Sequence, residues 1–258
     1  MLTTDYDDEA SDFVKARFIM FRKMIAEKTI SNGKNNTKKF LPMAIASEVG
    51  LLFGIVTNTQ PAAFWTLYYI LAADAGDQKK FSLLEKVRSK VQQNPYDPDQ
   101  WHFLEACMTE AFRLSWGGFQ TRDVIKPATI TTSQGTTFKV RLNDRVTTFP
   151  TLHHLDANNF PDPLTFDPNR WLNADDKNLM KLKRVVNVFG GGVSMCPGRR
   201  FAQREIKMLA AKLIQHFDIT FIDQSQRPKP GALVSKGAGR GIYPPAEPVY
   251  VKLALRKS

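Results

Sequence analysis

A cysteine stands in a glycine-rich stretch just before a predicted helix. The residues from Phe189 to Ala202 read FGGGVSMCPGRRFA, so Cys196 follows three consecutive glycines and precedes Pro197. Glycines permit a tight, closely approaching backbone, and proline restricts the residue before it. At the start of a helix, free backbone N–H groups and the positive helix end favour a thiolate over a thiol. A thiolate is a soft metal ligand, and N–H donors around its sulfur tune a bound metal.

Two plainer interpretations compete with a metal ligand. An isolated cysteine is usually a small hydrophobic core residue. Three glycines could form a phosphate loop, but no Lys-Ser/Thr pair follows them and no strand-turn-helix nucleotide unit frames them. The other cysteine, Cys107, has no CxxC partner either, which excludes a disulfide framework and an all-cysteine zinc site. The four histidines show no metal-ligand spacing.

Upstream, Glu110 and Arg113 are three residues apart and share one face of a predicted helix at 99–114. An exposed ion pair of this kind contributes little to stability. A further arginine, Arg170, lies between this pair and the cysteine, in the segment 166–171, FDPNRW.

Taken together, these motifs resemble the second half of the cytochrome P450 fold. Phe189, Gly192, Cys196 and Gly198 match the pattern Phe-x-x-Gly-x-x-x-Cys-x-Gly, and Arg199 follows it. The resemblance implies haem b (iron protoporphyrin IX) as the cofactor, with these five residues in its binding loop and Cys196 as the thiolate ligand of the iron. It also implies that Cys107, in the apolar stripe of the helix, is inert.

The same resemblance implies a structural cluster of Glu110, Arg113 and Arg170, which match a Glu-x-x-Arg helix and a Phe-x-Pro-x-Arg segment. Such a cluster would lock the irregular loop beneath the haem. If it is buried, removing one partner would cost about 3–5 kcal/mol.

An apolar segment at about 41–75 corresponds to the family's central helix, which carries Ala/Gly-Gly-x-Asp/Glu-Thr-Thr. Here 54–59 reads GIVTNT, so Thr57 replaces the usual acid and Asn58 the usual threonine. The resemblance places Thr57, Asn58 and Thr59 at the catalytic position, where a hydrogen-bonded chain delivers protons to oxygen. Asn58 can both donate and accept hydrogen bonds.

Several departures are similar to the sterol 7α-hydroxylase and prostacyclin-synthase branch of the family. They are Ser194 two residues before the cysteine, Asn58-Thr59 followed by 61–65, and the segments 154–156, 160–166 and 239–245. One side of this branch hydroxylates bulky lipids, and the other isomerises a peroxide without external electrons.

The resemblance therefore predicts a haem-thiolate monooxygenase that inserts one atom of O2 into a bulky apolar, sterol- or lipid-like substrate. Two alternatives stay open: an electron-independent isomerase or dehydratase of the same fold, favoured by Thr57 and Asn58, and an inactive fragment. The resemblance implies an NADPH-dependent flavoprotein reductase as the electron donor, and the net charge of +11 suggests that an acidic face of the reductase docks on this chain. It would dock on the basic residues near the cysteine loop: Lys181, Lys183, Arg184, Arg199 and Arg200. Nucleic acid is not expected as a partner, since no finger, recognition helix or aromatic-basic repeat accompanies the charge.

The fold class predicted is mainly α with small β-sheets, a truncated P450 fold in which 1–258 is a single haem-binding portion. Helices are expected at 12–29, 41–75, 81–93, 99–114 (with Asp99 as its cap) and 198–217. A hairpin of 124–130 and 138–142 is expected around Ser133-Gln134-Gly135, and a basic loop at 31–39. Residues 150–188 show little periodicity until Trp171, and the tail should form short strands and turns, with Leu233 and Val234 as candidate pocket residues.

The uncharged stretch 50–73 is long enough to cross a membrane. The polar residues 57–60 at its centre favour a buried helix instead. We expect an intracellular chain, whose parent enzyme lies in the endoplasmic reticulum membrane and is held there only through an N-terminal anchor outside this sequence.

Overall fold

The computed structural model describes residues 19, 23, 37–74, 82–222, 241–245 and 247–256. The chain divides into two units, Met1–Val56 and Thr57–Ser258. Of the predicted helix 12–29, only Ile19 and Lys23 are described, and both are helical. Leu233, Val234 and most of the predicted basic loop lie outside the described residues. The end of that predicted loop is helical instead, because α2 (Thr37–Gly54) already begins at Thr37.

The predicted helix at 41–75 consists of three segments. After α2, the π-helical η1 (Ile55–Thr59) leads into α3 (Gln60–Asp74). Pro61 has no N–H to donate to the carbonyl of residue 57, and its ring crowds that carbonyl, so a π-type turn at this place has a direct cause. α3 is largely buried, as predicted, whereas the described apolar side chains of α2 are mostly exposed. Within the described ranges, no helix has the length and hydropathy needed to cross a membrane.

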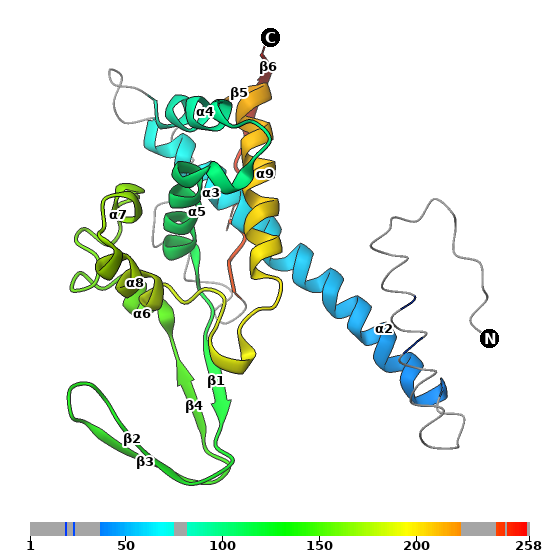
Figure 1. Cartoon of the computed structure of the whole chain (residues 1–258), viewed down its shortest axis with the longest axis vertical. Helices are drawn as coiled ribbons and strands as arrows, with labels where there is room; N and C mark the ends of the chain where they lie inside the picture. Colours follow the sequence, from blue (N-terminus) through cyan, green and yellow to red (C-terminus); the bar gives the residue numbers. More distant parts are fainter. Residues whose placement is uncertain are drawn as a thin grey trace. The chain divides into compact units, whose positions relative to one another are not determined.

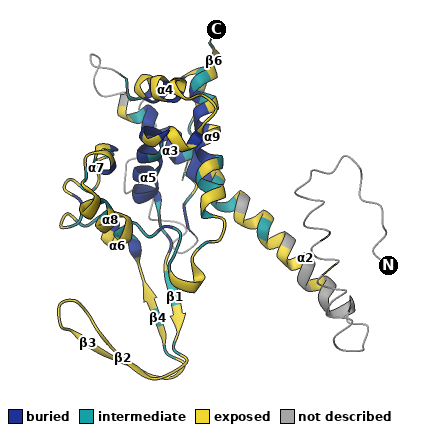
Figure 2. Cartoon of the chain, in the orientation of Figure 1, coloured by how far each residue is buried: buried dark blue, intermediate teal, exposed yellow. Residues whose placement is uncertain are grey.

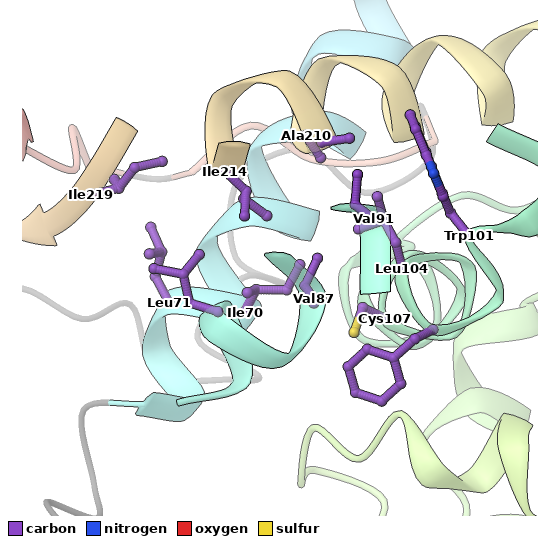
Figure 3. Packing of buried hydrophobic residues seen from close by; sticks show 13 residues of the cluster. Ile70, Leu71, Val87, Val91, Trp101, Leu104, Cys107, Ala210, Ile214 and Ile219 are labelled. Carbon is purple, nitrogen blue, oxygen red and sulfur yellow. The ribbon is translucent and has the colours of Figure 1, made fainter. Parts of the chain in front are cut away.

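α3 packs against three further helices, α4 (Leu83–Gln93), α5 (His102–Ser115) and α9 (Arg199–His216). Figure 1 shows α3, α5 and α9 side by side, and Figure 2 shows that their facing sides are buried. Apolar side chains from all four helices meet in one cluster (Figure 3), which includes Ile70, Val87, Leu104, Cys107 and Ile214. The three helices predicted at 81–93, 99–114 and 198–217 are confirmed.

The prediction that Asp99 caps the helix at 99–114 is wrong. The side chain of Asp97 instead accepts the N–H of Asp99 and caps a 3-10 turn, η2 (Pro98–Gln100). α5 starts after Trp101 without a side-chain cap. Pro98 suits the first position of a turn because its N–H would be unpaired there in any case, which moves the cap two residues upstream.

The strands form three two-stranded antiparallel sheets among the described residues. β1 (Gln120–Asp123) pairs with β4 (Arg145–Thr148), β2 (Ala128–Thr131) with β3 (Thr137–Val140), and β5 (Phe217–Phe221) with β6 (Val251–Leu255). The β2–β3 hairpin is the predicted one, and its turn uses Gly135 at φ +83°, a conformation that favours glycine. Its first strand starts at residue 128 rather than 124. Helices with small sheets confirm the predicted fold class.

Residues 150–188 are less irregular than predicted. They contain α6 (Pro150–His154), α7 (Asn169–Leu172) and α8 (Asp176–Val185), before η3 (Gly192–Ser194) in the cysteine loop. α8 starts at Asp175, whose side chain accepts the N–H of Asn178. Its half-buried Leu179, Leu182 and Val185 pack on a cluster that contains Phe160 and Trp171. Tertiary packing therefore orders a segment that has only a narrow apolar stripe.

Candidate cofactor site

Cys196 lies in a hydrogen-bonded loop between η3 and α9. Its N–H donates to the carbonyl of Phe189 at 2.8 Å, and the N–H of Met195 donates to Gly192 at 3.1 Å. Gly190 has φ +73° and Gly192 has φ +61°, which L side chains rarely adopt. The glycines that precede the cysteine therefore permit the turn that sets its position.

The cysteine also defines the entry to α9. The N–H and the guanidinium of Arg199 both donate to the carbonyl oxygen of Cys196, at 3.4 and 3.2 Å. A Cβ at Gly198 would lie 4.0 Å from the Cys196 sulfur, so this glycine borders the thiol. The thiol residue is half-buried. Of the predicted loop residues, the structure thus brings Phe189, Gly198 and Arg199 directly to Cys196, with Gly192 in the adjoining turn.

Two elements hold the loop from outside. The ring of Phe189 packs edge-on against Phe112 of α5, with centroids 5.9 Å apart. From β1, Gln120 donates to the carbonyl of Asn187 at 3.1 Å, and Arg122 donates to the carbonyl of Gly191 at 3.2 Å. Gln120 and Arg122 were not among the site residues predicted from the sequence. Their two-residue spacing, which places both side chains on one face of a strand, is the signal that was available.

Behind the loop, Glu110, Arg113 and Arg170 meet around one buried carboxylate. Arg113 donates twice to Glu110, at 2.7 and 2.9 Å, and both side chains have no exposed surface. Arg170 donates to Glu110 at 3.2 Å and is 12% exposed. The indole of Trp171 and the N–H of Asp167 complete the set, at 3.0 and 3.2 Å.

Arg113 connects α5 to the segment 154–165 as well. Its remaining N–H groups donate to the carbonyls of His154, Pro163 and Thr165, at 2.7, 2.6 and 3.3 Å. The guanidinium also lies over the ring of Phe160, 4.8 Å from its centroid. All five donors of the guanidinium are used, so this arginine fixes a loop that has little regular structure of its own.

The residues of the third predicted group lie on η1, a separate element. Thr57, Asn58 and Thr59 are all half-buried. The amide of Asn58 donates to the hydroxyl of Thr57 at 3.3 Å. The two polar side chains that distinguish this chain from the usual family pattern are therefore hydrogen-bonded to each other.

The lone thiol of Cys196 fits a haem iron. It does not fit a metal site whose ligands are all protein side chains. Throughout the part of the chain that the structure describes, no three His, Cys, Asp or Glu side chains gather in a metal-binding group. A lone thiol suits an iron whose other ligands would be supplied by a macrocycle. The other cysteine, Cys107, is fully buried in the helical core, and burial raises the pKa of its thiol well above the usual range.

We expect Glu110→Gln to lower the free energy of unfolding by about 3–5 kcal/mol, because it leaves the buried charge of Arg113 without its partner. Chemical denaturation of the purified chain measures this. Asp123→Asn is the matched control, since it breaks an exposed pair with Arg145. A Glu110→Gln chain as stable as the Asp123→Asn chain would contradict the role of the cluster.

The buried side chain of His154 should make the stability of the chain depend on pH. Burial, together with the charge of Arg113, lowers the pKa of His154 to about 4, from an ordinary 6.5. Between pH 6.5 and 4, His154 is therefore protonated in the unfolded chain and neutral in the folded chain. The free energy of unfolding should fall as the pH drops through this range, by up to about 3 kcal/mol. His154→Gln should remove this part of the slope, while His153→Gln, at an exposed neighbour, should keep it. An unchanged slope in His154→Gln would show that another group is responsible.

Comparisons with known proteins identify the family of this chain. A sequence profile of the family described as Cytochrome P450 matches residues 7–242. Cytochrome P450 7A1 of Sus scrofa is 29% identical over 228 residues, which are 81% of this chain and 45% of that protein. Cholesterol 7-alpha-monooxygenase of Cricetulus griseus is 28% identical over 267 residues, 96% of this chain and 50% of that protein.

Among solved structures, the retinoic-acid-bound cyanobacterial CYP120A1 is similar, with a TM-score of 0.58 and 25% sequence identity. The similarity covers 77% of this chain and 43% of that one. The chain spans about half the length of the curated relatives that it matches. On the profile match, the relatives and the fold, this chain belongs to the cytochrome P450 family.

Proposed function

We propose that this chain is the haem-binding part of a monooxygenase that uses Cys196 as the thiolate ligand of the haem iron. The observation that carries the proposal is the lone, half-buried thiol of Cys196 in a loop that is already shaped by two left-handed glycines and by its own N–H bond to Phe189. When bound, haem would supply the binding and activation of O2, favoured by electron density from the thiolate.

The chain's own residues would hold the haem in defined ways. Gly198 keeps the space beside the sulfur free of a side chain, Gly192 permits the turn before it, and Phe189 lies between the loop and α5. Arg122 and Arg199 hold the carbonyls of Gly191 and Cys196, and they place positive charge beside the loop. An indirect role falls to Glu110, Arg113 and Arg170. They would fix the segment 154–171, which precedes both α8 and the cysteine loop.

Thr57, Asn58 and Thr59 would handle the proton. A hydroxyl can accept a proton at Oγ1 and pass one on, whereas an amide is a poor proton carrier but a good hydrogen-bond donor and acceptor. We therefore assign the proton-carrying role to the hydroxyls of Thr57 and Thr59. Asn58 would orient them, in line with its bond to Thr57.

The proposed substrate is a bulky apolar molecule of sterol or other lipid type. Relatives of this chain are named cholesterol 7-alpha-monooxygenase and 7-alpha-hydroxycholest-4-en-3-one 12-alpha-hydroxylase. Insertion of one oxygen atom is the reaction we favour, and the parent enzyme would act at the endoplasmic reticulum membrane. The exchange of the usual acid for Thr57 favours a second candidate, an isomerase or dehydratase that needs no external electrons. Stoichiometric consumption of NADPH and O2 with product would support the first and exclude the second.

The proposed electron donor is an NADPH-dependent flavoprotein reductase with an acidic docking face. Lys181, Lys183 and Arg184 are exposed in the last two turns of α8, and Arg200 is exposed at the start of α9. α8 is followed by the cysteine loop, and α9 begins three residues after Cys196, so these cations flank the site in sequence. Opposite charges on the two proteins would raise the rate of association.

We expect electron transfer from such a reductase to slow as ionic strength rises, and Lys181→Glu/Lys183→Glu to slow it further at low salt. Stopped-flow reduction of the haem-loaded chain measures both effects. Lys90→Glu, at an exposed position of α4, is the control and should leave the rate as it is. A rate that does not depend on salt would remove electrostatic docking from the proposal.

The central test of the proposal is the reduced carbon-monoxide difference spectrum after haem is added. We expect a red-shifted Soret band in the wild type, because a thiolate ligand would shift the absorption of the carbon-monoxide-bound haem, and loss of that band in Cys196→Ser. Cys107→Ala is the matched control: it removes the buried cysteine of α5 and should keep the band. A wild-type chain that shows no red-shifted band would hold no thiolate-bound haem, and the proposal would fail.

A further inference from the structure

Residues 241–243 and 116–118 form a clamp, which we define by three contacts between them. The N–H of Gly117 donates to the carbonyl of Gly241 at 2.9 Å, and Trp116 and Ile242 form an antiparallel bridge. The hydroxyl of Tyr243 donates back to the carbonyl of Gly117 at 2.7 Å. The ring of Tyr243 also occupies the space that a Cβ at Gly117 would need, so the two segments fit closely.

The clamp is attached to α3. The indole N–H of Trp65 donates to the carbonyl of Tyr243 at 2.6 Å. Trp65 has no exposed surface, and its ring packs against Phe64, Tyr68 and Tyr69. A buried aromatic in several ring contacts has little freedom to move, so the clamp has a fixed place beside α3.

Within the clamp, Gly241 lies directly against Asn58. Gly241 is buried at φ +104°, and a Cβ there would collide with the side-chain oxygen of Asn58. The ring of Trp116 lies 3.7 Å from the same Cβ position, which is an ordinary contact. Asn58 is therefore the group that a side chain at position 241 would displace.

We infer that Gly241 is a positioning residue for Asn58. The Gly241 backbone limits the amide on one side, while the hydroxyl of Thr57 accepts its N–H on the other. The clamp holds Gly241 in that place through Gly117 and Tyr243. The inference deepens the proposed function and rests on it, because it gives the orientation of Asn58 a physical cause.

The contact itself is tested without haem, by a double-mutant cycle on thermal unfolding. Gly241→Ala should lower Tm both through its positive φ and through the collision with Asn58, so the loss should be clearly smaller in an Asn58→Ala background. Gly135→Ala is the control for strain alone: Gly135 has φ +83° and no atom within 4 Å of its Cβ position. Its Tm loss should be equal in both backgrounds. An equal loss for Gly241→Ala in both backgrounds would overturn the contact.

The effect of Gly241 on Asn58 in the haem-loaded chain is tested by infrared spectroscopy of carbon monoxide bound to the reduced haem. The stretching band of carbon monoxide responds to nearby polar groups. Gly241→Ala should shift this band in the wild-type background and leave it in place in the Asn58→Ala background, whereas Gly135→Ala should not shift it. If Gly241→Ala does not fold, Tyr243→Phe takes its place, because it removes the hydroxyl that donates to Gly117, and it should also shift the band. A band that does not move in whichever of these two variants folds overturns the inference. A wild type that binds no haem defeats the proposed function instead, while the unfolding cycle still decides whether the contact exists.

Discussion

The buried carboxylate of Glu110 connects α5 to a segment that lies far along the chain. An ionised carboxylate without water must be paired and hydrogen-bonded, and here Glu110 receives donors from Arg113, Asp167, Arg170 and Trp171. Three of these four partners lie 57 to 61 residues further along the chain. Satisfying one charge on α5 therefore fixes the course of a segment that has only short helices of its own.

The same helix also supports the cysteine loop. Phe112, next to Arg113, packs against Phe189, while β1, which follows α5, supplies Gln120 and Arg122 to the loop backbone. α5 is thus a shared support: its charged face holds the segment 154–171, and its aromatic face and following strand hold the residues around Cys196. A preformed loop spends less free energy on ordering when a cofactor binds. This is the physical sense in which a remote ion pair can matter to the proposed chemistry.

Much of this could be predicted from the sequence, where a signal is local. Helix periodicity predicted α4, α5 and α9, and the spacing of Glu110 and Arg113 with the motif around Cys196 indicated which residues to examine. The bonds of Gln120 and Arg122 to the loop and the approach of Gly241 to Asn58 were not predicted. Contacts between distant residues leave only an indirect signal in the sequence, such as the two-residue spacing of Gln120 and Arg122 on one strand. The π-helical turn before Pro61 and the order in α8 were also missed, because backbone crowding and tertiary packing decided them.

The claim at the centre of this account is that the Cys196 sulfur binds the haem iron. Iron K-edge X-ray absorption of the haem-loaded chain tests it most directly, since sulfur and nitrogen or oxygen ligands scatter differently. We predict one sulfur neighbour of the iron in the wild type and in Cys107→Ala, and none in Cys196→Ser. An iron with only nitrogen and oxygen neighbours in the wild type would contradict the account.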